Sequence, residues 1–194
     1  TNGHSIYGTS ASPFFKLPWG RCTQKESENG HSLFLHVFDW PKDGQLRVPG
    51  LKNDVRSVAL VADPDQKLDF NTDGQDLLIN VPEAAVDPVN TVIVVEIKGK
   101  PDVVSNMPTI KDGVISLPAE FADIHNKGYG IHAVLTGKGE NAVISNWIDA
   151  NTRLEWMFTT PVKGRYQVNA RVKAPEDSKI ILALAGEKVE TVVN

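Results

Sequence analysis

Hydrophobic and polar residues alternate with a period of two in short stretches along most of this chain. The clearest stretch is Ser32–Asp39, in which one face carries aliphatic residues and the other carries two phenylalanines and a histidine (Leu33, Leu35 and Val37; Phe34, His36 and Phe38). A two-residue period of this kind predicts a β-strand, here with apolar contacts on both faces. We expect this strand to lie at the centre of a β-domain.

Turn-forming residues follow this strand. Trp40-Pro41 ends the ladder, because proline has no N–H to donate and restrains the residue before it. Lys42-Asp43-Gly44 has the composition of a turn, and Gln45–Val48 then alternates again. We therefore predict a hairpin formed by Ser32–Asp39 and Gln45–Val48.

The same alternation predicts further short strands before Pro101. They are Trp19–Lys25, Ser57–Ala62, Lys67–Phe70, Leu77–Val81 and Thr91–Ile97. The first of them would pair with Ser32–Asp39 around a loop at Glu26–Gly30. Turn residues recur about every ten positions and no pattern of helical length occurs, which favours a β-sandwich.

A second set of alternating segments follows Pro101. Its members are Pro108–Ile110, Val114–Leu117, Ile131–Leu135, Arg153–Thr159, Tyr166–Lys173 and Ile180–Leu184, and Ala119–His125 favours one short helical turn. The fold class that we predict is all-β, with two consecutive antiparallel β-sandwich domains at 19–101 and 102–194. Residues 1–18 show no sustained period and form a connector, whose apolar side chains should lie against this domain or a neighbour.

Composition limits the classes of function. The 194 residues have 41% hydrophobic content, a net charge of −4 and no basic run, so a buried core is feasible and nucleic acid is a poor partner. The single cysteine, Cys22, excludes an intrachain disulfide and lies in a strand-like segment, where we expect it to be buried. No apolar run approaches the ~18 residues of a membrane span, and no signal peptide opens the chain.

Three separated segments of the first half carry a resemblance to a known family. They are NGHSIYGTSASPF (Asn2–Phe14), WGRCTQK (Trp19–Lys25) and LFLHVFDWPKDGQLRVPGL (Leu33–Leu51). In this order, and over about Asn2–Pro101, the chain resembles the region just after the catalytic barrel of family 29 α-L-fucosidases. The resemblance implies that 1–18 leads from a missing catalytic barrel domain, that 19–101 is the β-sandwich after it, and that the protein is extracellular or periplasmic.

The resemblance also implies where the chemistry lies. Members of this family are retaining glycosidases, which use two carboxylates roughly 5 Å apart as nucleophile and acid/base, and both belong to the barrel. A (β/α)₈ barrel takes roughly 250 residues with alternating strands and helices, which this chain does not provide. We therefore expect no catalytic residue and no cofactor in this chain, and the missing barrel as its partner.

Other catalytic and metal sites find little support in the sequence. Asp69–Gly74 matches the first half of an EF-hand loop, but Asn80 stands where the bidentate glutamate belongs and strand-like alternation surrounds the segment, so we predict a turn. No G-x-S-x-G elbow accompanies His36, which we expect to pack beside Phe34 and Phe38 with its polar tip bonded. The other histidines lack the spacing of a zinc site.

The second half carries a separate resemblance. The pattern NWID…LEWMF…P…G…Y…V at Asn146–Val168 is similar to the galactose-binding-like jelly roll of carbohydrate-binding modules. Such modules usually continue further than Asn194, which leaves open whether this second sandwich is complete. The resemblance implies a carbohydrate-binding module, functional or vestigial.

Sugar binding is therefore the functional hypothesis for the second half. Carbohydrate modules stack sugars on exposed aromatic rings and add hydrogen bonds from polar side chains. The residues that fit this role lie in or near loops (Trp147, Asn146, Asp149, Asn151 and Tyr129). Trp156 and Tyr166 occupy apolar faces of alternating segments and are expected in the core, whereas Trp40 is expected to contact a neighbouring domain.

The function that these patterns favour is that of a non-catalytic C-terminal β-sandwich region of an α-L-fucosidase-like hydrolase, whose parent enzyme cleaves terminal α-L-fucosides. The alternative is a free-standing carbohydrate-binding or adhesion module, which would have no use for the apolar connector at Thr1–Trp19. A third reading, a structural spacer, predicts no exposed aromatic residue beside the polar loop at Trp147.

Overall fold

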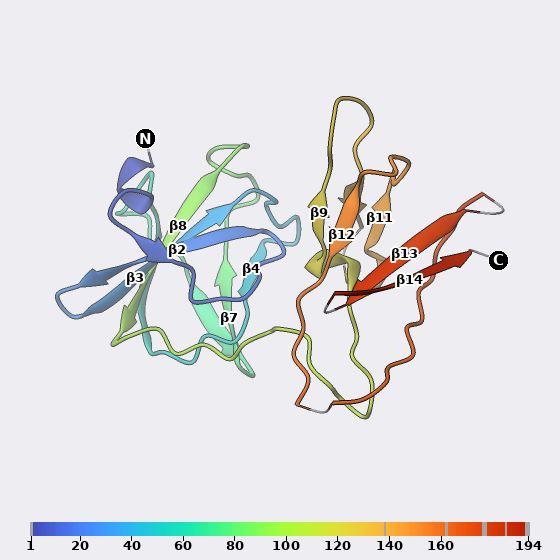
Figure 1. The fold of residues 1–194 in the computed structure, drawn as a ribbon. Helices are drawn as coiled ribbons and strands as arrows, with labels where there is room; N and C mark the ends of the chain where they lie inside the picture. The colour runs from blue at the N-terminus through green and yellow to red at the C-terminus, as the bar shows by residue number, and fades with distance from the viewer. Residues whose placement is uncertain (1, 138, 162, 176–177, 185, 193–194) are drawn as a thin grey trace. The chain divides into compact units, whose positions relative to one another are not determined.

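The structure is a computed structural model that describes residues 2–137, 139–161, 163–175, 178–184 and 186–192. The all-β prediction is confirmed, since every helix in these residues is a single 3₁₀ turn (η1, Gly3–Ser5; η2, Ala119–Phe121; η3, Gly139–Asn141). None of these helices is long and apolar enough to cross a membrane. The chain divides into two compact units, Thr1–Thr160 and Pro161–Asn194, which are described separately below (Figure 1).

The larger sheet of the first unit has five antiparallel strands. Its spatial order is β1 (Ser10–Ala11), β2 (Gly20–Ser27), β3 (Gly30–Val37), β8 (Thr91–Lys98) and β5 (Val55–Leu60). Strand β3 lies at the centre, where Leu35 is opposite Cys22 of β2 and Ile93 of β8. The predicted hairpin around Glu26–Gly30 and the predicted central strand are therefore confirmed.

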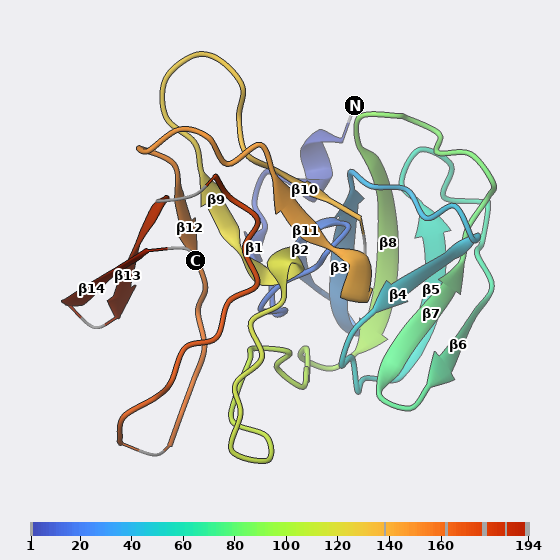
Figure 2. The same cartoon turned by 90° about the vertical axis from the view of Figure 1, so that its right-hand side faces the viewer.

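A second sheet of three antiparallel strands covers one face of the first. Its order is β4 (Gln45–Val48), β7 (Asp76–Asn80) and β6 (Phe70–Asp73), with β6 at the outer edge (Figure 2). Strands β6 and β7 form a hairpin in which Asp73 is opposite Asp76, and Gly74 has φ +62 between them. The turn that we predicted over Asp69–Gly74 is therefore only partly confirmed, because Phe70–Asp73 is strand β6 and the turn itself lies at Gly74 and Gln75.

The predicted hairpin between Ser32–Asp39 and Gln45–Val48 is wrong. Strand β3 belongs to the five-stranded sheet, whereas β4 pairs with β7 in the other sheet. Both strands carry buried aliphatic side chains, such as Leu35 and Leu46. The aliphatic side chains of both strands are buried because the strands lie on opposite sides of the core. The turn at 38–44 therefore carries the chain from one sheet to the other.

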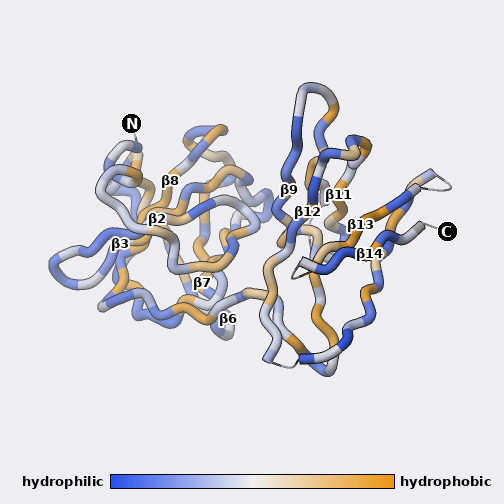
Figure 3. Tube along the Cα trace, viewed as in Figure 1, coloured by the Kyte–Doolittle hydropathy of each residue, from blue (hydrophilic) through white to orange (hydrophobic). Residues whose placement is uncertain are grey.

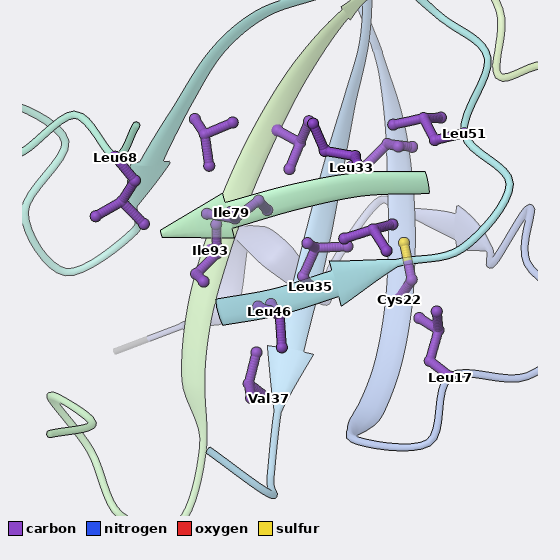
Figure 4. Packing of buried hydrophobic residues seen from close by; sticks show 14 of the residues in the cluster. Leu17, Cys22, Leu33, Leu35, Val37, Leu46, Leu51, Leu68, Ile79 and Ile93 are labelled. Carbon is purple, nitrogen blue, oxygen red and sulfur yellow. The ribbon is translucent and has the colours of Figure 1, made fainter. Parts of the chain in front are cut away.

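The hydrophobic core lies between these two sheets. Figure 4 shows side chains of both sheets meeting there. The largest fully buried side chains come from five of the strands (Leu33, Leu35, Leu46, Val48, Val58, Leu60, Leu77, Ile79, Ile93, Val95 and Ile97). A two-layer antiparallel sandwich is therefore the structure of this part of the chain.

The amino-terminal segment lies largely on the same sandwich. Phe14, Leu17 and Trp19 are buried and belong to the core cluster, whereas Ile6 and Tyr7 are 53% and 79% exposed. The indole of Trp19 donates a hydrogen bond from Nε1 to the carbonyl oxygen of Arg47, 2.7 Å away, and so links the start of β2 to β4 of the other sheet.

Trp40 is held within the first sandwich, and its predicted contact with a neighbouring domain stays a prediction. Its Nε1 donates to the carbonyl oxygen of Pro82 over 2.8 Å, and its ring packs against the core of the first sandwich. A contact with a neighbouring domain is therefore not needed to explain why this tryptophan is present.

Residues 102–160 form smaller pieces of β-structure. Strand β9 (Asp123–His125) pairs with β12 (Arg153–Glu155), and β10 (Val134–Thr136) pairs with β11 (Val143–Ser145), both antiparallel. The predicted helical turn is present as η2. Among the described residues of this range, the buried ones are Pro108, Ala133 and Thr152, so little apolar area is removed from water here.

In the described residues of the second unit, β13 (Lys179–Leu184) and β14 (Glu187–Val192) form one hairpin. Figure 3 shows the hydrophobic stretch of β13, which the sequence predicted at Ile180–Leu184. The predicted strand at Tyr166–Lys173 is absent, and Tyr166 is 39% exposed instead of lying in a core. The extent of the second domain, 102–194, stays a prediction.

Candidate carbohydrate-binding site

The loop before β12 holds four of the five predicted sugar-binding residues. Asn146 begins it with φ +59, a left-handed conformation that asparagine adopts more readily than most residues. The Asp149 carboxylate accepts hydrogen bonds from the backbone N–H of Asn151, at 2.8 Å, and from its side-chain amide, at 3.1 Å. These bonds shape the loop, so Asp149 acts first as a turn residue.

Trp147 is held at one edge of its ring. Its Nε1–H donates to the carbonyl oxygen of Thr152 at 3.1 Å, while 41% of the residue remains exposed. Thr152 is buried, and its hydroxyl donates to Oδ1 of Asn126 at 3.2 Å. The loop is therefore fixed to the chain beyond β9, and an indole fixed at one edge can present its exposed area to a ligand.

An open depression of about 530 Å³ adjoins this loop. Six residues line it (Ile124, His125, Asn126, Lys127, Asn151 and Arg153). The pairing of β9 with β12 creates it, because that register places His125 opposite Arg153 (Figure 1). Of the predicted residues, only Asn151 contributes to the lining.

Ionic contacts connect two of the lining residues. Glu155 lies 3.2 Å from Nε2 of His125 and 3.1 Å from Nη2 of Arg153, so one carboxylate bridges both side chains. All three side chains are between 44% and 69% exposed, which limits the stabilisation to the modest values typical of surface pairs. The bridge holds the Arg153 guanidinium on Glu155, beside the depression.

Tyr129 lies apart from this arrangement. It is fully exposed, in a loop closed by two hydrogen bonds between the Asn126 side chain and the backbone of Ala133, at 2.9 and 3.0 Å. Across the part of the chain that the structure describes, no ring contact joins Tyr129 to Trp147. The structure therefore assembles Asn146, Trp147, Asp149 and Asn151, and its depression adds residues that the sequence analysis did not select.

Comparisons with known proteins find similarity among solved structures. No family model and no curated protein matches the chain. Among solved structures, it is similar to α-L-fucosidase isoenzyme 1 from Paenibacillus thiaminolyticus (31% identity, 50% of this chain, 23% of that chain, TM-score 0.42). It is also similar to a family 29 α-L-fucosidase from Bacteroides thetaiotaomicron (20% identity, 50% of this chain, 22% of that chain, TM-score 0.44). A third similar structure is α-L-fucosidase from Vibrio sp. strain EJY3 (21% identity, 57% of this chain, 20% of that chain, TM-score 0.43). The chain thus spans less than a quarter of the length of these fucosidases.

The side chains of Cys22 and Arg47 have structural roles. Burial raises the pKa of the Cys22 thiol from its ordinary value of 9.0 to about 12, partly offset by a hydrogen bond with Ser12, so this thiol is a poor nucleophile. Arg47 pairs with Asp76 at 2.8 Å and with Asp73 at 3.0 Å, and both bonds raise its pKa. In the described residues, no group of acidic, histidine or cysteine side chains could hold a metal ion.

Proposed function

We propose that this chain is the non-catalytic C-terminal β-sandwich region of an α-L-fucosidase-like glycoside hydrolase. In this proposal, the parent enzyme hydrolyses terminal α-L-fucosides with retention, and both catalytic carboxylates lie in a barrel that precedes residues 1–18. Residues 19–101 brace that barrel, and the protein works outside the cell or in the periplasm, where its glycan substrates are found.

One observation carries this proposal: residues from the three family-like segments meet at a single atom. The carbonyl oxygen of Ser5, from the first segment, accepts hydrogen bonds from Oγ1 of Thr23, in the second, and from Nε2 of His36, in the third. Ser5 and His36 are both buried. Because each segment forms a hydrogen bond with a polar group of another, the three segments support one another within one sandwich.

A glycine of the second segment supports the same reading. A Cβ at Gly20 would collide with the backbone oxygen of His36. The backbone of the third segment therefore requires glycine at position 20 of the second segment. This requirement is a physical reason why the second and third sequence motifs occur together.

We propose further that residues 102–194 form a carbohydrate-binding module. The exposed indole of Trp147 and the polar depression beside its loop support this role, since sugar sites combine an aromatic surface with a few hydrogen-bonding side chains. A structural spacer would have no use for an exposed tryptophan held in place by Thr152.

The reading frame upstream of Thr1 tests the enzyme proposal. We expect it to encode, without interruption, a segment of roughly 250 residues with alternating strand and helix patterns. A start codon and ribosome-binding site immediately before Thr1 would contradict the proposal and favour a free-standing carbohydrate-binding or adhesion protein.

A further inference from the structure

The depression between β9 and β12 has a composition unlike that of the whole chain. The protein has 24 acidic residues against 20 lysines and arginines and 5 histidines, yet none of the six lining residues is acidic. Three of them, His125, Lys127 and Arg153, are basic, and Asn126 and Asn151 are amides. The lining therefore offers hydrogen-bond donors together with the positive charges of Lys127 and Arg153, which suit an anion.

The nearby carboxylates are engaged by other groups. Glu155 bridges His125 and Arg153, at 3.2 and 3.1 Å, while Asp149 accepts both of its described bonds from Asn151. Asp123, at the start of β9, pairs with Lys16 at 2.9 Å. In the described residues, Lys127 has no carboxylate within salt-bridge distance, so its charge is available to a ligand.

Trp147 and two of the lining residues, Asn151 and Arg153, belong to the same short segment of the chain. Trp147 is bonded through Nε1 to the carbonyl oxygen of Thr152, and Thr152 stands in the chain between the lining residues Asn151 and Arg153. The bond from Trp147 thus ties the aromatic side chain to the backbone between two lining residues. Guanidinium binds carboxylate and sulfate through two parallel N–H bonds, which fixes the orientation of such a group.

We propose that this site binds an anionic sugar, one that carries a carboxylate or a sulfate, with the anion on Arg153 and Lys127 and the sugar ring on Trp147. This inference rests on the proposed carbohydrate-binding role of residues 102–194 and adds the class of ligand. Asn151 donates to sugar hydroxyls in this arrangement, and Glu155 weakens binding because it competes for Arg153.

Calorimetric titration of the full chain tests the charge preference. The probes are digalacturonic acid, galactose 6-sulfate and the neutral galactose disaccharide with the linkage of the first probe. We expect at least one anionic probe to bind about tenfold more tightly than the neutral one at low salt, and the difference to shrink as salt rises. The two anionic probes also show whether carboxylate or sulfate is preferred.

Variants separate a binding role from a structural one. Arg153→Gln and Lys127→Gln should each weaken binding of the anionic probe about fivefold, and Glu155→Gln should strengthen it by a similar factor. Arg56→Gln is the matched control, because Arg56 is also an exposed strand arginine but lies on β5, and it should change nothing. Lys127 lies outside the strands, so its variant stays informative if Arg153→Gln fails to fold.

Three outcomes would overturn the inference. Equal affinity for the neutral disaccharide would remove the charge preference and leave the sugar-binding proposal intact. Inorganic sulfate or a single-stranded oligonucleotide binding as tightly as the saccharides would mean a general anion site. No binding of any saccharide would overturn both this inference and the carbohydrate-binding role, without bearing on the enzyme proposal, which the upstream reading frame tests.

Discussion

Nε2 of His36 donates a hydrogen bond to the backbone carbonyl oxygen of Ser5, 3.3 Å away, inside the first sandwich. The direction of the bond follows from chemistry, because a carbonyl oxygen can only accept. Nδ1 of the same ring therefore accepts from the side-chain amide of Asn90, at 3.4 Å. Through this imidazole ring, the amino-terminal segment is bonded to the central strand β3.

Replacing His36 should detach that segment. His36→Leu leaves the buried carbonyl oxygen of Ser5 and the partly buried amide of Asn90 without this partner, so we expect the free energy of unfolding to fall by about 1–3 kcal/mol. Hydrogen exchange at residues 3–7 should accelerate as well. His31→Leu is the control, since His31 lies on the same strand but is less buried and bonds only to the carbonyl oxygen of Gly99. Equal losses for the two variants, measured by urea unfolding, would show that the contact with Ser5 adds nothing specific.

The buried thiol of Cys22 makes stability depend on alkaline pH. Its pKa is about 12 in the folded protein against an ordinary 9.0, so the unfolded chain loses this proton first and the free energy of unfolding falls as the pH rises from 9 toward 12. Relative to Cys22→Ala, the natural protein should lose about 1 kcal/mol between pH 8 and pH 10. Urea unfolding at the two pH values measures this, and parallel losses in both proteins would refute it.

The two aspartates that pair with Arg47 are not equivalent. Asp76 also accepts the backbone N–H of Gly50 at 3.0 Å, and its side chain is 27% exposed against 60% for Asp73. Asp76→Ala should therefore cost about 1 kcal/mol of stability, whereas Asp73→Ala should cost less than about 0.5 kcal/mol. Thermal unfolding ranks the two variants. If Asp73→Ala lowers the stability more than Asp76→Ala, the bond between Asp76 and Gly50 does not stabilise the protein in the way proposed.

Trp147 and Tyr129 should contribute differently to glycan binding. Trp147→Ala removes an indole that Thr152 fixes in place, and we expect affinity for a bound glycan to fall about tenfold. Trp147→Phe keeps a ring and should retain most of the affinity. Tyr129→Ala, at a fully exposed loop position, should have little effect. Titration of the three variants decides, and unchanged affinity in Trp147→Ala would exclude this ring as the platform.

Local pattern located most strands of the first sandwich, but it placed the strand before Gly74 at Lys67–Phe70 when β6 is Phe70–Asp73, and it did not predict how the strands are arranged. The predicted strand Thr91–Ile97 is β8 within one residue, and the turn at Gly74 lies where expected. Alternation reveals which face of a strand is apolar. It does not reveal which sheet completes that face, and β4 was therefore assigned to β3 when its partner is β7.

The same limit applies to the candidate site. Trp147 and Asn151 were found because they lie together in one polar loop of the sequence. His125 was missed, because it becomes part of the depression only when β9 pairs with β12, and the predicted helical turn, Ala119–His125, included it. Long-range pairing leaves no local signal, and only the basic character of His125, Lys127 and Arg153 could have suggested their association.

Turnover of 4-nitrophenyl α-L-fucopyranoside by the purified chain is the most direct test of where the chemistry lies. If the reactive carboxylates belong to a preceding barrel, this chain releases no nitrophenol above the buffer rate, while the product of the longer reading frame does. Turnover that stays with this chain through successive purification steps would instead place a catalytic pair within these residues and contradict the proposed scaffold role.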